Sequence, residues 1–168
     1  MSDHIQFGTV DLPTDWFNIR SAIPYDLPLP IDGNTGEPFS FEKLKTMYSS
    51  ECARIELQMG AYGKEGMIPI PAPVLDEYRK YRPTPIFRAR GFERALGYEG
   101  AIYFKREDMN PSGSHKPNTA LPQAYYAKED GLTQLVTDTG AGQWGAALAY
   151  SCLRFGIECT VFMRGCPA

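Results

Sequence analysis

The sequence predicts an α/β fold that contains parallel-sheet βαβ units and a proline-rich N-terminal arm, and two observations support this prediction. From Arg82 onward, short strand-like and longer helix-like apolar patterns alternate, which is typical of βαβ units. Of the 14 prolines, ten fall between Pro13 and Pro85. Because proline fixes φ and lacks a backbone donor, the first half favours extended chain over long helices and central strands.

Within the N-terminal half, two segments have a helical pattern. The stretch 11–38 has closely spaced prolines, so we expect it to run extended over a surface. Ser40 offers an N-cap, apolar residues recur at helical spacing through Met59, and Gly60 follows as the expected stop. A second short helix is expected over 74–81.

The second half predicts strands and helices in alternation, each helix ending at a glycine, which adopts the left-handed backbone conformation of a helix end at low cost. The expected strands are 84–87, 101–106, 134–137 and 157–163. The expected helices are 88–96, 115–129 and 144–155, ending at Gly97, Gly131 and Gly156, with Pro117 in the first turn of the second one. We divide the chain into an arm with helices (1–81), an α/β part (82–133) and the start of a further domain (134–168).

Composition excludes several classes of protein. Lys and Arg total 17 against 20 Asp and Glu, a formal net charge of -3, which disfavours nucleic acid and anionic membranes as partners. No run approaches the ~18 apolar residues of a membrane span, and no secretory signal is visible, so we expect a cytoplasmic protein. The 4 cysteines form no CxxC pair and only 2 histidines are present, so we expect no metal site. Cys152 and Cys159 lie in apolar stretches, which favours buried, reduced thiols there.

Lys116 is the first candidate for chemistry. It lies where a helix is expected to begin, so the helix dipole and partial desolvation disfavour the protonated amine and leave a better nucleophile. A lysine that forms a Schiff base needs this property. Gly113, His115 and Asn118 supply backbone turning and polar groups able to hold a phosphate or a ring hydroxyl. The alternative is an ordinary surface lysine.

A second junction, 138–145, also follows an expected strand and precedes a helix. It lacks the lysine and hydroxyl residue of a nucleotide-binding P-loop. Successive backbone N–H groups in such a turn bind anions, so a carboxylate is expected there, with Asp138 as a candidate acid or base. The alternative is a tight connection in which Gly145 allows close packing. Since ligands bind beyond the carboxyl ends of strands, we expect both junctions to face one site. The expected anion-binding residues are Thr139, Gly140, Ala141, Gly142 and Gln143.

Four segments together resemble a known family. They are Arg82-Pro83-Thr84-Pro85, the run 103–108 (YFKRED), the run 113–120 (GSHKPNTA) and the run 139–145 (TGAGQWG). They resemble the beta chain of tryptophan synthase, most closely its divergent second class, which has a longer N-terminal arm and a tryptophan at the position of Trp144. The resemblance extends over nearly the whole chain.

The resemblance implies a pyridoxal-phosphate enzyme of fold type II that joins L-serine to indole by β-replacement and releases water and L-tryptophan. Lys116 would form the internal aldimine and later move the serine α-proton, while His115 and Asn118 would lie against the cofactor phosphate and ring. The complete enzyme would be a homodimer that can pair with an alpha chain, and 134–168 would begin its mobile communication domain. The residues that would hold the substrate carboxylate are Thr139, Gly140, Ala141, Gly142, Gln143 and Trp144.

Three departures from the family bear on activity. The family has glutamate at Asp138, a carboxylate that helps serine lose its hydroxyl, and a shorter side chain can miss hydrogen-bond reach. Pro122 falls inside the helix after Lys116 and could tilt the lysine. The family chain continues far beyond Ala168, so this chain matches its N-terminal portion. Two alternatives stay open: another pyridoxal-phosphate serine/threonine β-eliminase or cysteine synthase, and a non-catalytic interaction fragment.

Overall fold

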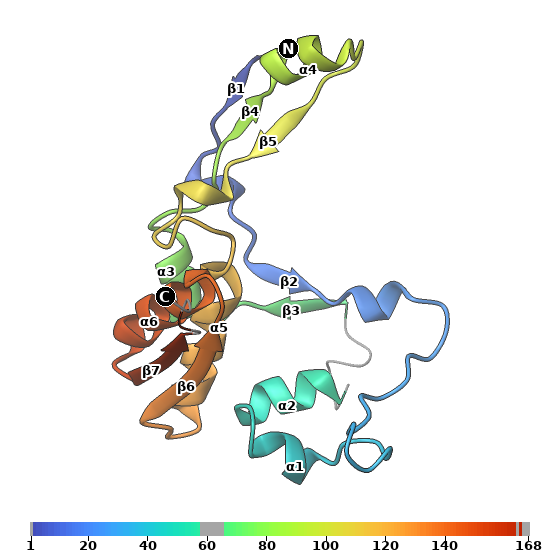
Figure 1. Cartoon of the computed structure of the whole chain (residues 1–168), viewed down its shortest axis with the longest axis vertical. Coiled ribbons are helices and arrows are strands. Elements are labelled where there is room, and N and C mark those ends of the chain that lie inside the picture. Colours follow the sequence, from blue (N-terminus) through green and yellow to red (C-terminus); the bar gives the residue numbers. More distant parts are fainter. Residues whose placement is uncertain (1, 58–65, 164, 166–168) are drawn as a thin grey trace.

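The computed structural model describes residues 2–57, 66–163 and 165, and its fold is mixed α/β (Figure 1). The expected helix stop at Gly60 and the thiol of Cys166 lie outside the described residues. The helices are α1 (Phe41–Lys45), α2 (Ser50–Glu56), α3 (Ala72–Tyr78), α4 (Arg90–Leu96), α5 (Pro117–Glu129) and α6 (Gln143–Phe155). The strands are β1 (His4–Ile5), β2 (Asp15–Phe17), β3 (Met67–Pro69), β4 (Ile86–Arg88), β5 (Tyr103–Lys105), β6 (Gln134–Thr139) and β7 (Glu158–Met163). Short 3-10 helices occupy Thr9–Asp11, Ile19–Ala22 and Glu107–Met109.

Strands β6 and β7 form a parallel pair connected by α6. Leu135 packs against the core, whereas its neighbour Val136 is 60% exposed, because successive side chains of a strand point to opposite faces. Helix α6 lies very close to this pair at Gly145, where an added Cβ would be 2.5 Å from Cγ1 of Val161. The close packing at Gly145 that the alternative interpretation of the 138–145 junction requires is therefore present.

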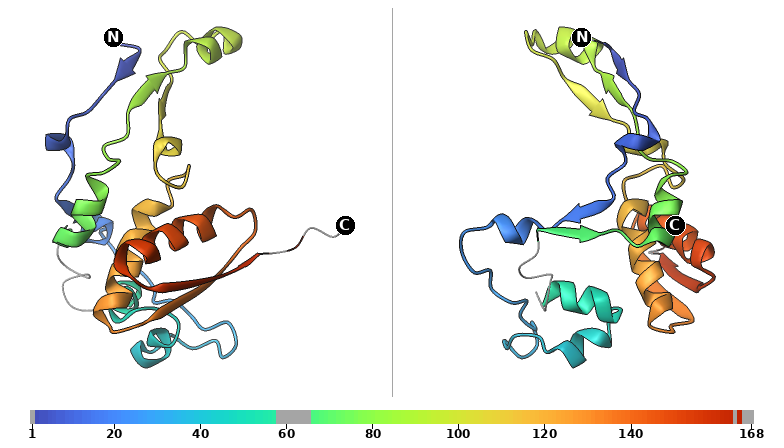
Figure 2. Two further views of the ribbon diagram at one scale, coloured as in Figure 1. Left: turned by 90° about the vertical axis from the view of Figure 1, so that its left-hand side faces the viewer. Right: turned by 180° about the vertical axis from the view of Figure 1, so that it is seen from behind.

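The hydrophobic core lies where α3, α5 and α6 meet, beside the β6–β7 pair (Figure 2). Helix α5 presents mainly small side chains to its neighbours, which allows the helices to approach closely. The buried residues of this core on the three helices are Val74, Leu75, Tyr78, Ala120, Leu121, Ala124, Ala127, Ala147, Leu148, Cys152 and Phe155. This compact part of the molecule carries both predicted junctions at the start of α5 and of α6.

The prediction that 84–87 and 101–106 join a parallel sheet is wrong. Strands β4 and β5 pair antiparallel, and β1 adds to β4 in a three-stranded sheet of order β1-β4-β5. Helix α4, which connects β4 to β5, buries only Glu93 and leaves Phe92 and Leu96 more than half exposed. Without a buried apolar face, α4 does not cover the sheet as a crossover helix does, and the chain returns beside β4 in the opposite direction.

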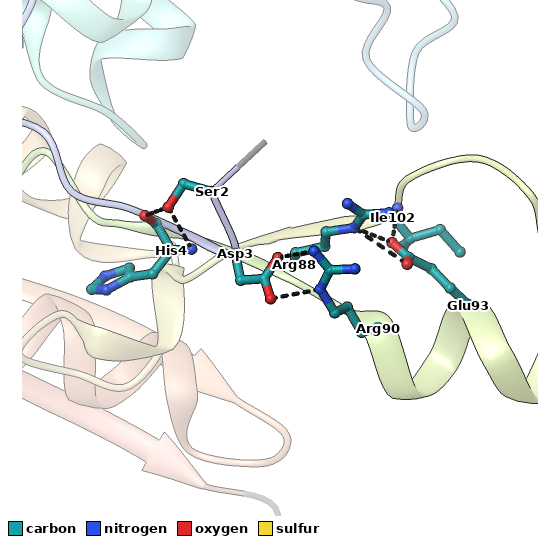
Figure 3. A network of polar contacts seen from close by, with 7 residues as sticks. All are labelled: Ser2, Asp3, His4, Arg88, Arg90, Glu93 and Ile102. Atoms are coloured by element: carbon teal, nitrogen blue, oxygen red, sulfur yellow. Dashed lines mark hydrogen bonds and ion pairs between the residues drawn. The ribbon is translucent and has the colours of Figure 1, made fainter.

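Polar contacts hold α4 and the N-terminal strand to this sheet (Figure 3). Nε of Arg88 and the backbone N–H of Ile102 both donate to Oε1 of Glu93, at 2.9 and 2.8 Å. These two donors hold the pKa of Glu93 below its usual value. Nε of Arg90 donates to Asp3 at 2.5 Å, which ties the residues before β1 to the start of α4.

The prediction of one continuous helix from Phe41 to Met59 is wrong, because the structure has two helices within the described part of this range, 41–57. Ser40 caps α1 as expected, since its side chain accepts from the N–H of Lys43. Helix α1 ends at Lys45, and Ser49 then caps α2 by accepting from the N–H of Cys52. A serine at the boundary satisfies the free N–H groups of a new helix, so the apolar spacing continues across a break in the backbone.

Pro122 lies inside α5, yet the helix continues through it. Proline has no N–H, so the carbonyl of Asn118, one turn earlier, loses its helical donor. The hydroxyl of Tyr78, from α3, donates to this carbonyl instead. Tyr78 is fully buried, and burial raises its pKa to about 12, so it stays a donor at neutral pH. The missing helical hydrogen bond is therefore replaced by a contact between two helices.

Tyr78→Phe should lower the free energy of unfolding by about 1–2 kcal/mol, because it leaves the partly buried carbonyl of Asn118 without a donor. Pro122→Ala supplies a backbone N–H at the right position in α5. The loss caused by Tyr78→Phe should therefore be much smaller in the Pro122→Ala background. Urea unfolding of the four chains of this double-mutant cycle measures the difference, and strictly additive effects would contradict the replacement of one hydrogen bond by the other.

Glu77 of α3 connects its own helix to α6. Its carboxylate accepts from Nε of Arg154 at 2.8 Å and from Nζ of Lys80 at 2.5 Å, and its side chain is nearly buried. Burial opposes ionisation of this carboxyl, but the two hydrogen bonds and the two positive charges outweigh it and lower its pKa. Glu77 therefore stabilises the folded chain in its ionised form.

Glu77→Gln should lower the free energy of unfolding at pH 7 by about 1–2 kcal/mol. Because the folded pKa lies below the unfolded one, this stabilisation is present above about pH 4.5 and is lost as the pH falls through the folded pKa. The wild-type and variant stabilities should converge in acid. Asp76→Asn is the control, because the exposed Asp76–Arg79 pair should contribute less than about 1 kcal/mol. Equal stability of Glu77→Gln and wild type at pH 7 would disprove the prediction.

Candidate functional site

Lys116 lies at the N-cap position of α5, with Pro117 as the first helical residue, as the sequence predicts. The side chain is half-buried, and among the described residues its amine takes part in no hydrogen bond or ion pair. His115, the residue before it, is exposed. An amine that is partly shielded from water and has no partner within the described chain is available for reaction with an aldehyde.

Asn110 shapes the loop that leads to Lys116. Its side chain is buried, donates to the carbonyl of Ser114 and accepts from the N–H groups of Ser112 and Ser114. The hydroxyl of Ser114 then accepts from the N–H of Lys116 at 3.4 Å. Gly113 has a φ of 67°, a left-handed conformation that glycine adopts at low cost. These contacts hold the backbone in a fixed path up to the lysine.

Asn118, predicted to lie against the cofactor, already has protein partners. Its Nδ2 donates to Oε2 of Glu107 at 2.8 Å, and its Oδ1 accepts from the hydroxyl of Tyr81 at 3.1 Å. One N–H of the amide remains for a ligand, so a contact with the cofactor stays a prediction. The side chain therefore belongs first of all to a hydrogen-bond network with Glu107 and Tyr81, which both precede the 110–116 loop in the sequence.

The glycine loop connects β6 to α6 as expected. Gly142 has a φ of 93° at the N-cap of α6. Within the described residues, no backbone carbonyl accepts from the N–H groups of Gly140, Ala141 and Gly142. Asp138 is exposed and Thr139 is buried at the end of β6, and both line a hollow of about 470 Å³ with Gly140, Phe162 and Met163. Unpaired N–H groups beside an open hollow suit a carboxylate.

Trp144, also predicted to contact the substrate carboxylate, directs its ring elsewhere. The ring N–H donates to Oγ1 of Thr137 at 2.9 Å. The half-buried ring lines a cavity of about 220 Å³ together with Met47, Tyr48 and Cys52. The only polar atom of the side chain is therefore occupied, and a contribution of Trp144 to anion binding would have to come from its backbone. Gln143, the neighbouring residue, is exposed.

The structure places the two junctions at the starts of two packed helices, but no described hydrogen bond or ion pair joins one junction to the other. That they face one site stays a prediction.

The sequence did not reveal the residues that hold the lysine junction, although the YFKRED run contains the central one, Glu107. Its signal was an acidic residue in a short polar loop before a helix that carries a reactive lysine. The missed residues are Tyr78, Tyr81, Thr84, Glu107, Asn110 and Ser114.

The donor set fits pyridoxal phosphate together with an amino acid. The unpaired amine of Lys116 suits the aldehyde of the cofactor, and the unpaired N–H groups of Gly140 to Gly142 suit the carboxylate of an amino acid. No group of three or more His, Cys, Asp or Glu side chains in residues 2–57, 66–163 and 165 could hold a metal ion. Across the same ranges, no helix combines the length and the apolar character that crossing a membrane requires.

Comparisons with known proteins point to the same chemistry. A family model described as "Pyridoxal-phosphate dependent enzyme" matches residues 78–166, which include both junctions. Tryptophan synthase beta chain 2 of Thermotoga maritima is 46% identical over 153 residues, which is 91% of this chain and 35% of the relative. Tryptophan synthase beta chain 2 of Methanothermobacter thermautotrophicus is 42% identical over 164 residues, or 97% of this chain and 37% of the relative. The chain thus spans about a third of the length of the curated relatives it matches.

Proposed function

Because the chain belongs to the pyridoxal-phosphate dependent enzyme family, we propose that it carries the lysine junction of a tryptophan synthase beta-type lyase. The reaction joins L-serine and indole to give L-tryptophan and water, a step of aromatic amino-acid biosynthesis. Lys116 is the observation that carries the proposal: it starts α5 with an amine that has no partner among the described residues. The identity of 46% with a tryptophan synthase beta chain supports this reaction over others of the family.

The chain supplies three groups to this reaction. Lys116 binds the aldehyde of the cofactor and moves the proton at the α-carbon of serine. The N–H groups of Gly140, Ala141 and Gly142 bind the carboxylate of serine and fix its orientation. Asp138 passes a proton to the departing serine hydroxyl, which leaves as water. Pyridoxal phosphate, when bound, supplies the electron sink that makes the α-proton removable.

The same proposal assigns the remaining ligand contacts and the assembly of the complete enzyme. His115 and the free N–H of Asn118 contribute to cofactor binding, and Thr139 and Gln143 add donors beside the carboxylate. The complete enzyme is proposed to be a cytoplasmic homodimer that associates with an alpha chain. The segment 134–168 is proposed to begin its mobile communication domain.

Product analysis tests the reaction. The chain is incubated with pyridoxal phosphate and L-serine, with indole in one arm and sulfide in the other, and Lys116→Ala serves as the control. Tryptophan that forms in the indole arm only, and only with Lys116 present, supports the proposal. Cysteine in the sulfide arm, or pyruvate in both, would identify a different β-replacement or elimination. No product together with cofactor attached to Lys116 would restrict this chain to cofactor binding.

A further inference from the structure

A carboxylate outside the predicted site lies behind the first turn of α5. Glu107 belongs to the 3-10 helix Glu107–Met109 and is more than half shielded from solvent. Its Oε1 accepts from the hydroxyl of Thr84 at 2.6 Å, and its Oε2 accepts from Nδ2 of Asn118 at 2.8 Å. One side chain therefore connects the 82–85 segment to the residue two positions after Lys116.

The surroundings of Glu107 stabilise the ionised form of its carboxyl group. Burial opposes its ionisation, but the hydrogen bonds from Thr84 and Asn118 and the positive charges of Lys105 and Arg82 outweigh burial and hold its pKa below the usual value. Nζ of Lys105 lies 3.6 Å from Oε1. An ionised carboxylate only accepts hydrogen bonds, so the amide of Asn118 must present its NH₂ group to Glu107.

The opposite end of the same amide is fixed as well. Oδ1 of Asn118 accepts from the hydroxyl of Tyr81 at 3.1 Å, and the backbone carbonyl of Asn118 accepts from Tyr78. Asn118 lies in the first turn of α5, where its own N–H donates to the carbonyl of His115 at 3.1 Å. The carbonyl of Lys116 accepts from the N–H groups of Thr119 and Ala120 in the same turn, at 3.1 and 3.0 Å. The contacts of Asn118 thus determine how the first turn of α5 is held.

We propose that Glu107 is a positioning residue for Lys116: it fixes the amide of Asn118 and thereby the first turn of α5, from which the reactive amine projects. This inference rests on the proposed function only in assigning the cofactor to that amine. It also gives Asn118 a role as a link between Glu107 and Lys116, in addition to any contact with a ligand.

Exchanging the two groups tests the link. Glu107→Gln places an NH₂ group opposite the NH₂ of Asn118, or loses the acceptor of Thr84 if the amide turns over. Asn118→Asp places two carboxylates against each other. In the double variant Glu107→Gln/Asn118→Asp, the glutamine donates to the new aspartate and accepts from Thr84, and the aspartate accepts from Tyr81, so all three hydrogen bonds are restored. Glu99→Gln, at an exposed glutamate, is the matched control.

Two measurements on these variants test the proposal. Labelling with pyridoxal phosphate and borohydride, mapped by peptide mass spectrometry, gives the ratio of modification at Lys116 to that at Lys128, an exposed lysine at the other end of α5. We expect each single variant to lower this ratio about tenfold, because small misplacements of a reacting group have large effects. The double variant should recover it only in part, because Asn118→Asp also removes the N–H proposed to contact the cofactor. Hydrogen exchange at the N–H groups of Thr119 and Ala120 should accelerate in the single variants and recover in the double variant.

The outcomes separate this inference from the proposed function. A wild-type ratio in Glu107→Gln, or hydrogen exchange at Thr119 and Ala120 in the double variant as fast as in the single variants while the chain is still folded by circular dichroism, would overturn the positioning role. If wild-type Lys116 does not react with pyridoxal phosphate, the proposed function fails for this chain. The link is then decided by hydrogen exchange and by the same ratio measured with formaldehyde and borohydride, which methylate amines without a cofactor site.

Discussion

Lys116→Ala should abolish the specific covalent attachment of pyridoxal phosphate to this chain. The amine of Lys116 is half-buried at the start of α5 and has no hydrogen-bond or ion-pair partner among the described residues, so it is the amine best placed to react with an aldehyde. Titration of the wild type with the cofactor should give a new visible absorbance band and, after borohydride, a modified peptide that contains Lys116. Neither should appear in Lys116→Ala.

Lys128→Ala is the matched control, because it removes an exposed lysine from the last turn of the same helix. It should keep both the absorbance band and the modified peptide at the wild-type level. A band of equal size in wild type and Lys116→Ala would show that the reaction is with surface lysines in general. That result would contradict the assignment of Lys116 while leaving the fold unaffected.

Gly145→Val should lower the free energy of unfolding by about 3 kcal/mol, the upper part of the range for added volume in a packed core. Gly145 of α6 is buried against the β6–β7 pair. A Cβ there would lie 2.5 Å from Cγ1 of Val161 and 3.1 Å from Cγ2 of Thr139, so the helix or both strands must move. Urea unfolding, followed by circular dichroism, measures the loss.

Two comparisons isolate the cause of this loss. Gly91→Val also adds a branched side chain to a helix, but a Cβ at Gly91 meets no atom within 4 Å, so the stability should change by less than about 0.5 kcal/mol. Val161→Ala removes the methyl group that an added Cβ would meet, so Gly145→Val should cost less in that background. An unchanged cost would mean that contact with Val161 is not the reason.

The elements around the core were predictable because their signals are local. Gly97 and Gly156 end α4 and α6 with positive φ, and Pro117 starts α5, as glycine and proline do in any helix. The pairing of β1 with β4 was not predictable, since nothing near His4 encodes a partner more than 80 residues away. The same holds for the antiparallel return of β5, which depends on α4 failing to bury an apolar face. The division of the chain into 1–81, 82–133 and 134–168 stays a prediction.

The candidate site was predictable to a similar extent. The position of Lys116 at a helix start follows from Pro117 and from the polar loop before it. The network behind it does not, because Tyr78, Tyr81 and Glu107 reach Asn118 through space from other elements. Pro122 illustrates the limit: the sequence predicts a lost hydrogen bond in α5, but only the packing of α3 shows that a tyrosine replaces it.

The contact between Asp3 and Arg90 determines the order in which the chain can fold while it is being synthesised. The residues before β1 leave the ribosome well before their partner Arg90, which is 87 positions further along, and β4 comes at nearly the same distance. Strand β1 therefore stays unpaired until β4 and α4 have emerged. In contrast, β6, α6 and β7 lie within 30 consecutive residues (134–163) and can assemble as soon as they are made. Ribosome-bound chains stopped at successive lengths should thus acquire protease resistance in residues 2–5 only after β4 and α4 have emerged.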